Sequence, residues 1–215
     1  MQVSPIPIPE AICNDSRFSS LLGAAAWNAL PATLRRRFRK RLQGGASVAY
    51  QGKVVKMKLS LAGRILAHAA RLIGARLPYD MSSQGQPAVV VVTEDIASNG
   101  QFWIRQYNRK SGFPQVIHSS KRFAGPTGLE EYICYGIGMA LRVEAQDEAL
   151  YFKSDHYFFQ ILGHRLRLPS MLSPGALVIG HHDLGNGAFL FSLDLHNRLF
   201  GSLIQQDALF QDAKE

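Results

Sequence analysis

The part of the chain from residue 86 onward consists of short segments in which apolar and polar residues alternate, with turn signals between them. The pair Asn99–Gly100 separates 88–97 from 101–109, and such a pair is typical of a hairpin turn between two strands. We predict further strands at 113–123, 130–146, 149–153, 156–166, 176–183, 187–197 and 201–209. A spacing of about 10–12 residues with short connections is typical of an antiparallel meander.

A sheet of this length is expected to curl or to close on itself, because open sheets of many strands are rarely flat. Helical spacing of apolar residues predicts helices within 16–43 and 60–77. The segment 46–58 reads as one more strand, with one face formed by Val48, Tyr50, Gly52, Val54, Lys56 and Lys58. We therefore expect an α+β protein that is mainly β, with a curved antiparallel meander sheet or barrel-like shell of about 8–10 strands and N-terminal helices packed on it.

The chain has the size and composition of a single domain. It has 215 residues, and 47% of them are hydrophobic, which suffices to build a core. Prolines alternate with isoleucines in 1–14, which predicts an extended N-terminal arm, and 15–210 then form one domain that is β-rich over 86–209. No stretch approaches the run of about 18 apolar residues that a membrane-spanning helix needs.

The cysteine content excludes several classes of protein. There are two cysteines, Cys13 and Cys134, and no C-x-x-C pair, so a disulfide scaffold, a zinc ribbon and a thioredoxin motif are excluded. The N-terminus has neither an early positive charge nor an apolar run, so a secretory signal is not expected. We expect a cytoplasmic protein, with the inner membrane surface as the alternative location.

The positive charge of the chain is concentrated in one place. The net charge is +8, and six of the 24 basic residues lie in the heptad 35–41. This heptad is either a solvated helix end, where cations favour the helix dipole, or a contact for an anionic lipid surface, phosphate ligand or acidic protein. Specific nucleic-acid recognition is not expected, because the basic residues are not spread over a face with interleaved aromatics. The helix at 60–77 is basic and amphipathic, so it packs on the core or lies on a membrane.

Two strand faces carry candidate binding residues. Trp103, Arg105 and Tyr107 share a face, and such a row can form cation–π pairs or bind a planar or anionic ligand. In 131–143 one face is bulky and apolar, and the other is small in its middle, formed by Cys134, Gly136, Gly138, Ala140 and Arg142. Glycine in a strand often marks a bend or a close approach, and the alternative is free volume for a ligand inside a curved sheet.

Other constellations are less convincing. Ser192, Asp194 and His196 are triad residue types on one strand face, but neighbours at i and i+2 stand about 6.5–7 Å apart at Cα, too far for a triad contact. His181 and His182 point to opposite faces of a strand, so we expect no metal site there. A G-x-G-x-x-G motif is missing, and we expect no cofactor.

An ordered set of short motifs resembles a known family. The set comprises Leu30–Pro31, Gly44–Gly45, Leu77–Pro78, Trp103-x-Arg105-x-Tyr107, Ser120, Glu131, the segment 163–174, Gly187-x-Phe189-x-Phe191, His196 and Gly201. It resembles the uncharacterised family labelled domain of unknown function 4166 over about residues 20–209. The resemblance implies an accessory domain, found alone or attached to saccharopine-dehydrogenase-like reductases. It provides no catalytic residue, and the chain departs from the family pattern at Gln101, Gly175 and 205–209.

Three functional hypotheses follow. The first is a module that binds a hydrophobic or aromatic ligand, which can be acidic, in a curved β-sheet pocket, through Trp103, Arg105, Tyr107, Cys134, Gly136, Gly138, Ala140, Arg142 and Ser192. The second is a cofactor-independent cyclase or isomerase acting on a polyketide- or terpene-like substrate, with acid–base catalysis by Asp194, His196, Glu131 and Tyr107. The third is a peripheral membrane protein docking through 35–41 and 60–77. The expected partners are a hydrophobic small molecule and, as alternatives, an anionic membrane or a reductase.

Overall fold

The computed structural model describes residues 14–134 and 136–212, so the predicted arm at 1–14 lies outside the described residues except for Asn14. Within these ranges the strands form one antiparallel sheet in the order β6-β5-β4-β3-β2-β1-β11-β10-β9-β7-β8, and β6 also pairs with β7. Their bounds are β1 (Ser47–Leu59), β2 (Pro87–Asp95), β3 (Gly100–Tyr107), β4 (Gln115–Arg122), β5 (Glu130–Cys134), β6 (Ile137–Gln146), β7 (Ala149–Ile161), β8 (His164–Arg167), β9 (Ala176–Gly185), β10 (Ala188–Asn197) and β11 (Gly201–Gln211). The β6–β7 pairing closes a barrel, with β8 outside the ring on the edge of β7, so the predicted mainly β, barrel-like fold is confirmed.

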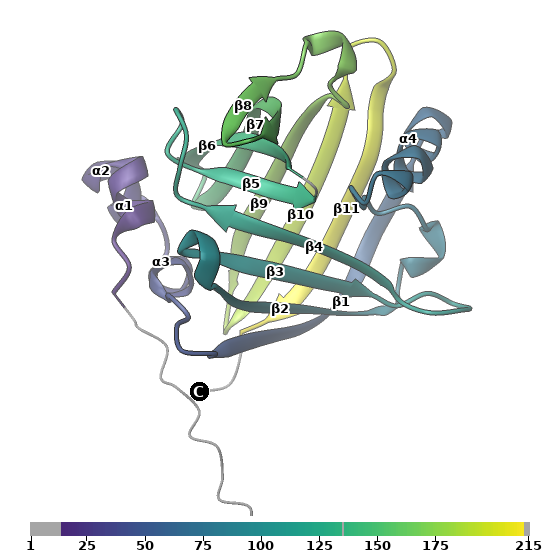
Figure 1. Cartoon of the computed structure of the whole chain (residues 1–215). Helices are drawn as coiled ribbons and strands as arrows, with labels where there is room; N and C mark the ends of the chain where they lie inside the picture. The colour runs from purple at the N-terminus through teal and green to yellow at the C-terminus, as the bar shows by residue number, and fades with distance from the viewer. Residues whose placement is uncertain (1–13, 135, 213–215) are drawn as a thin grey trace, which may run out of the picture.

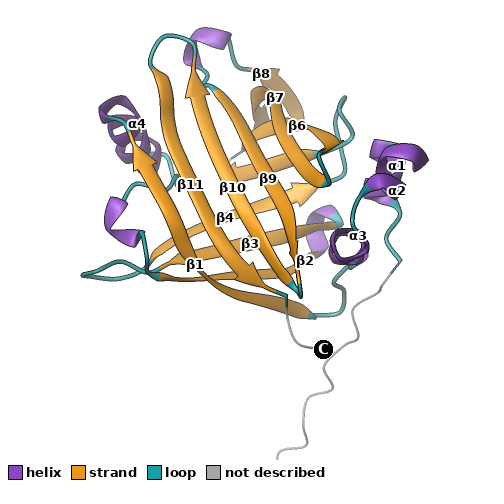
Figure 2. Ribbon diagram, turned by 180° about the vertical axis from the view of Figure 1, so that it is seen from behind, coloured by secondary structure: helices purple, strands orange, loops and turns teal. Residues whose placement is uncertain are grey.

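The barrel is flattened into two layers whose strands cross steeply. Strands β2, β3, β4 and β5 form one layer, and β9, β10 and β11 form the other (Figures 1 and 2). Strand β1 belongs to both layers, because Ser47–Lys53 pair with β2 and Gln51–Leu59 pair with β11. Crossed layers of this kind bring side chains from non-adjacent strands into one interior.

The helices lie on opposite sides of the barrel. On one side are α1 (Arg17–Leu22), α2 (Ala24–Ala29) and α3 (Ala32–Arg39), and on the other is α4 (Leu61–Leu72) (Figure 1). The helical segment predicted at 16–43 is broken at Gly23, which has φ 78°, and at Pro31. Short 3₁₀ turns are formed by Met81–Ser83, Ile96–Ser98 and Ser170–Leu172. None of the helices in the described ranges has the length and apolar character needed to cross a bilayer.

The predicted face of β1 is correct only as far as Val54. The register of the pairing between β1 and β11 shifts between Val54 and Lys56. Met57 rather than Lys56 therefore continues the inner face, and it is 2% exposed. A β-bulge adds one residue and so reverses the alternation beyond it. The prediction that Lys56 and Lys58 share a face with Val54 is therefore wrong.

The strand predicted at 130–146 is in fact a hairpin. β5 ends at Cys134, β6 begins at Ile137, and Gly136 between them has φ 79°, a conformation that glycine adopts without strain. The two strands predicted at 149–153 and 156–166 are instead one long strand, β7, followed by β8. The hairpin predicted at Asn99–Gly100 is confirmed, with Asn99 left-handed at φ 54°.

Side chains fill the barrel interior at the level of α3. Phe38 of α3 contacts Phe152 and His181, with ring centroids 5.7 and 5.1 Å apart. His181 of β9 also meets Trp103 of β3 at 6.2 Å, although these strands belong to the two opposite layers. Continuous contact of this kind is the packing of an ordinary core, so the interior is not a hollow shell at this level.

Candidate functional site

The residues of β3 that the sequence singled out face the interior. Trp103, Arg105 and Tyr107 are 9%, 5% and 1% exposed, and they alternate with half-exposed or exposed neighbours. Burial raises the pKa of Tyr107 to about 12, against a smaller opposite effect of Arg105, so its hydroxyl stays protonated at neutral pH. The predicted face of this strand is therefore confirmed.

Arg105 belongs to a buried ionic cluster that joins three strands. Lys121 Nζ of β4 lies 2.8 Å from Oε2 of Glu131 on β5. Ser119 Oγ donates to Glu131 Oε1 at 2.5 Å and accepts from Arg105 Nη1 at 3.1 Å, and Arg105 Nη2 lies 3.4 Å from the same Oε1. Two buried cations thus share one buried carboxylate, which leaves the cluster with an excess of positive charge.

The protonation of the cluster follows from its geometry. Burial alone would raise the pKa of Glu131, but the charges of Lys121 and Arg105 and the hydrogen bonds from Lys121 and Ser119 lower it to about 2. Burial lowers the pKa of Lys121, and Glu131 partly offsets this effect. Glu131 is therefore a carboxylate at neutral pH and a poor proton acceptor.

A cavity of about 450 Å³ opens where β4 and β5 separate. These strands pair only through Ser120–Arg122 and Glu130–Tyr132, and beyond this short ladder they diverge (Figure 1). The lining combines apolar and aromatic side chains with hydroxyl-bearing and basic ones, namely Phe102, Tyr132, Ile133, His118, Ser119, Ser120 and Arg122. Cys134 and Gly136 also line it, which brings two of the predicted binding residues to its edge.

Ser119 connects this cavity to the buried cluster. It lines the cavity, and its Oγ is hydrogen-bonded to both Glu131 and Arg105. A ligand group that reaches Ser119 is therefore one hydrogen bond away from Arg105.

Burial raises the pKa of Cys134, and its Sγ donates to the carbonyl of Ile73 at 3.0 Å, so this thiol is not an activated nucleophile.

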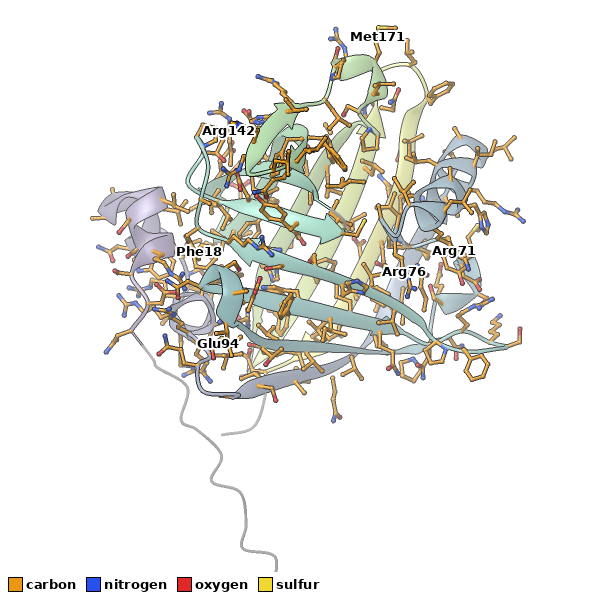
Figure 3. All side chains as sticks on the ribbon, in the orientation of Figure 1. Phe18, Arg71, Arg76, Glu94, Arg142 and Met171 are labelled. Carbon is orange, nitrogen blue, oxygen red and sulfur yellow. The ribbon has the colours of Figure 1, made fainter. Side chains whose placement is uncertain are left out.

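The remaining predicted residues of β6 lie on the outer wall. Gly138 stands against the ring of Phe158, where an added Cβ would lie 2.5 Å from the ring. Arg142 has an exposed side chain and pairs with Asp155 at 2.6 Å, and Figure 3 shows it at the side of the barrel away from Arg71 and Arg76. Ala140 alternates with the inward Met139 and Leu141. The prediction that these small residues line the interior is wrong, because the bulky residues Met139 and Leu141 point inward and the small residues between them face outward.

The outer face of β10 carries the other candidates. Asp194 Oδ2 accepts from Gln205 Nε2 at 3.1 Å, Ser192 Oγ lies 3.3 Å from His182 Nε2, and His196 is exposed. The alternate residues Phe191, Leu193 and Leu195 face inward. The barrel wall therefore separates Asp194 and His196 from Glu131 and Tyr107, and these four residues do not come together.

Several interior polar atoms are unpaired. Nε1 of Trp103, Nδ1 of His181 and both amide atoms of Gln206 are buried and find no hydrogen-bond partner among the described residues. Burial lowers the pKa of His181 well below its ordinary value, and the charges of Arg37, Lys121 and Arg105 lower it further. Among the described residues, no group of three or more His, Cys, Asp or Glu side chains is placed to hold a metal.

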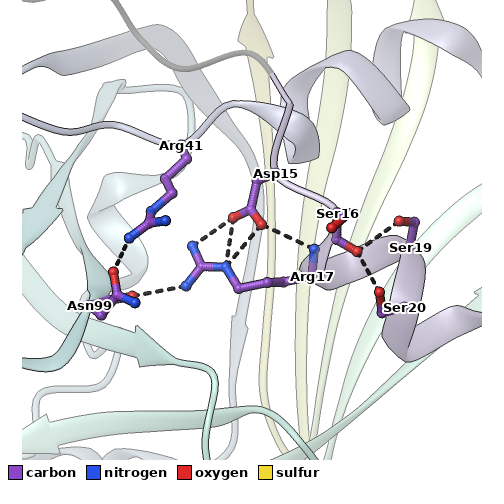
Figure 4. Close-up of polar contacts among 7 residues, drawn as sticks. All are labelled: Asp15, Ser16, Arg17, Ser19, Ser20, Arg41 and Asn99. Atoms are coloured by element: carbon purple, nitrogen blue, oxygen red, sulfur yellow. Dashed lines mark hydrogen bonds and ion pairs between the residues drawn. The ribbon is translucent and has the colours of Figure 1, made fainter.

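The basic heptad 35–41 makes contacts within the protein. Arg37 is 7% exposed, binds Asp212 through two hydrogen bonds of 2.8 Å, and lies over the ring of Phe189 at 3.8 Å. Arg41 donates to the side chain of Asn99, whose backbone carbonyl accepts from Arg17 (Figure 4). Through these contacts the arginines attach the N-terminal helical segment to the barrel.

Sequence reasoning missed the residues of β4. Ser119 and Lys121 lie two residues apart and share the inner face, but β4 carries polar residues on both faces, so alternation did not identify an interior. His118 becomes part of a cavity only because β5 leaves β4 beside it, beyond the pair Ser120–Tyr132.

Comparison with known proteins assigns the family. The family model described as domain of unknown function (DUF4166) matches residues 30–210, nearly the whole chain. No curated protein matches the sequence. The matched region includes the β4–β5 cavity and the barrel strands, with β11 up to Phe210. The chain therefore belongs to the DUF4166 family.

Proposed function

We propose that this protein is a binding module for a small hydrophobic or aromatic acid, which it holds in the cavity between β4 and β5. The volume of about 450 Å³ lies within the range of about 300–1,000 Å³ that is typical of small-molecule sites. We place the site in the wall of the barrel rather than at its centre, where the sequence suggested it, because Trp103 and His181 fill the centre.

The observation that carries the proposal is the position of Ser119. Ser119 lines the cavity, and its hydroxyl is hydrogen-bonded to Arg105, within a cluster of two cations and one carboxylate. A buried excess of positive charge is unfavourable until an anion approaches it. An acidic group of the ligand at the Ser119 end of the cavity provides that anion.

The cavity also offers contacts for the apolar part of the ligand. Phe102, Tyr132 and Ile133 are among its lining residues, and the guanidinium of Arg122 lies 4.1 Å from the ring centroid of Tyr132. An aromatic ring can pack against such a surface by stacking and edge contacts. The residues proposed for acid–base catalysis lie on two sides of the wall, so we restrict the proposal to binding.

Calorimetric titration with a matched pair of compounds tests the proposal. We expect 2-naphthoic acid to bind and its neutral amide to bind at least about tenfold more weakly, because the amide lacks the charge that the cluster favours. Ile133→Trp should fill the cavity and abolish binding. Ile104→Trp, on the exposed face of β3 outside the cavity, is the control and should bind normally. Equal affinity for acid and amide, or full affinity in Ile133→Trp, would reject the site.

A further inference from the structure

A second cavity, of about 900 Å³, lies between the C-terminal half of α4 and the connection from β3 to β4. Three arginines line it, Arg71, Arg76 and Arg109, together with the ring of Tyr79. Figure 3 shows Arg71 and Arg76 as neighbours beside α4. These residues come from three segments of the chain, so the fold rather than a local basic run brings them together.

Among the described residues, only one of the three arginines has an acidic partner. Arg109 forms an ion pair with Asp80. Arg71 Nη1 lies 3.4 Å from Nδ1 of His68, and its guanidinium lies 4.5 Å from the ring centroid of Tyr79. Arg76 Nη1 donates to the carbonyl of Val116 at 3.4 Å. Within the described part of the chain no carboxylate forms an ion pair with Arg71 or Arg76, so the cavity carries two uncompensated positive charges.

The position of these charges is not explained by the helix. Arg71 lies in the last turn of α4, where a cation favours the helix dipole. Arg76 lies beyond the end of the helix at Leu72, so the dipole does not account for it. Its side chain instead turns back to β4 and closes the cavity wall, which keeps its charge beside that of Arg71.

We propose that this cavity binds a phosphate group, as a free phosphate compound or as the head group of a lipid. A phosphate monoester carries a charge of about −1.5 to −2 at neutral pH, which matches the two unpaired arginines better than a single carboxylate does. Guanidinium groups also match the geometry of phosphate oxygens through paired hydrogen bonds. The residues differ from those of the β4–β5 cavity, so this site does not depend on the acid-binding function.

The rim of the cavity indicates why a lipid source must be tested. Leu72 and Phe113 stand at the rim and are 89% and 90% exposed. Exposed apolar side chains beside cations are typical of surfaces that contact membranes. Free phosphate would use the arginines alone, whereas a lipid would also engage Leu72 and Phe113.

Two binding assays test the proposal. The first is calorimetric titration with inorganic phosphate and pyrophosphate, and the second is sedimentation with phosphatidylcholine vesicles that do or do not contain phosphatidic acid. The double variant Arg71→Gln/Arg76→Gln should weaken binding by about tenfold or more, because it removes two charge-assisted contacts. Arg64→Gln, exposed on the same helix but outside the cavity, removes one charge, as the single variant Arg76→Gln does; it is the control and should bind normally.

The outcomes are distinct. Binding of soluble phosphate that is lost in the double variant supports a free phosphate compound. Binding only to vesicles with phosphatidic acid, lost in the double variant and in Leu72→Ser/Phe113→Ser, supports a lipid head group. The proposal is overturned if neither probe binds, or if Arg64→Gln loses as much affinity as the double variant. Arg71 and Arg76 are exposed, and Arg76→Gln alone serves as the second variant if the double variant does not fold.

Discussion

Trp103 of β3 and His181 of β9 meet inside the barrel with ring centroids 6.2 Å apart. Their strands belong to opposite layers, so this contact spans the interior and fills it. The arrangement excludes a ligand from the barrel centre at this level, and it explains why the candidate site lies in the wall between β4 and β5. Three of the following predictions test the packing and charge that maintain this arrangement.

Phe152→Ala should destabilise the protein strongly. The ring is fully buried and contacts Phe18, Phe38 and His181. Removing a buried aromatic ring from a packed core costs about 3–5 kcal/mol, which chemical denaturation should detect. Phe113→Ala, at a site 90% exposed, is the control and should change the free energy of unfolding by less than about 0.5 kcal/mol. A small effect of Phe152→Ala would mean that the interior is loosely packed.

Glu131→Gln should also be costly, because it leaves Lys121 and Arg105 buried without a carboxylate. Breaking a buried ion pair on one side costs about 3–5 kcal/mol in free energy of unfolding. Adding Lys121→Met should recover part of that loss. The control is Glu144→Gln, whose partly exposed pair with Lys153 should contribute at most about 1 kcal/mol. If Glu131→Gln and Glu144→Gln had the same effect, the cluster would not be electrostatically important.

Stability should fall as the pH decreases from about 6.5 to about 5. Burial keeps the pKa of His181 well below its ordinary value, with a further contribution from Arg37, Lys121 and Arg105. The unfolded chain therefore binds a proton below about pH 6.5 that the folded protein does not, at up to about 1.4 kcal/mol per pH unit. In His181→Leu the slope of unfolding free energy against pH should decrease. An unchanged slope would show that His181 is protonated in the folded state.

Gly63→Ala should destabilise the attachment of α4, although alanine is the better helix former by about 1 kcal/mol. An added Cβ would lie 2.1 Å from the carbonyl oxygen of Leu203, so the helix must move away from β11. Overpacking of this kind costs about 1–3 kcal/mol. Hydrogen exchange of the α4 amides should become faster in Gly63→Ala and stay unchanged in Arg64→Ala. Slower exchange in Gly63→Ala would contradict the close approach.

Local sequence patterns predicted well where the strands and helices lie. Beyond an irregularity such as a β-bulge, they did not predict which residues of a strand face inward. The alternation in 101–109 placed Trp103, Arg105 and Tyr107 on one face correctly, because that strand is regular. The same rule failed after the bulge at Val54, since the bulge inserts a residue that alternation cannot detect. On β6 the alternation held, but the small face proved to be the outer one. The β4–β5 cavity could not be predicted from the sequence, for a different reason. It depends on where the pairing of two strands ends, and that is decided by tertiary packing rather than by either strand alone.

The most direct test of the β4–β5 site is a titration of ¹⁵N-labelled protein with 2-naphthoic acid, followed by amide chemical shifts. We expect the largest shifts at Ser119, Ile133 and Cys134, which line the cavity, and small shifts at His181 and Leu193, which lie on the opposite layer of the barrel. Largest shifts around His181, or at the outer residues Asp194 and His196, would place the ligand elsewhere and contradict binding between β4 and β5.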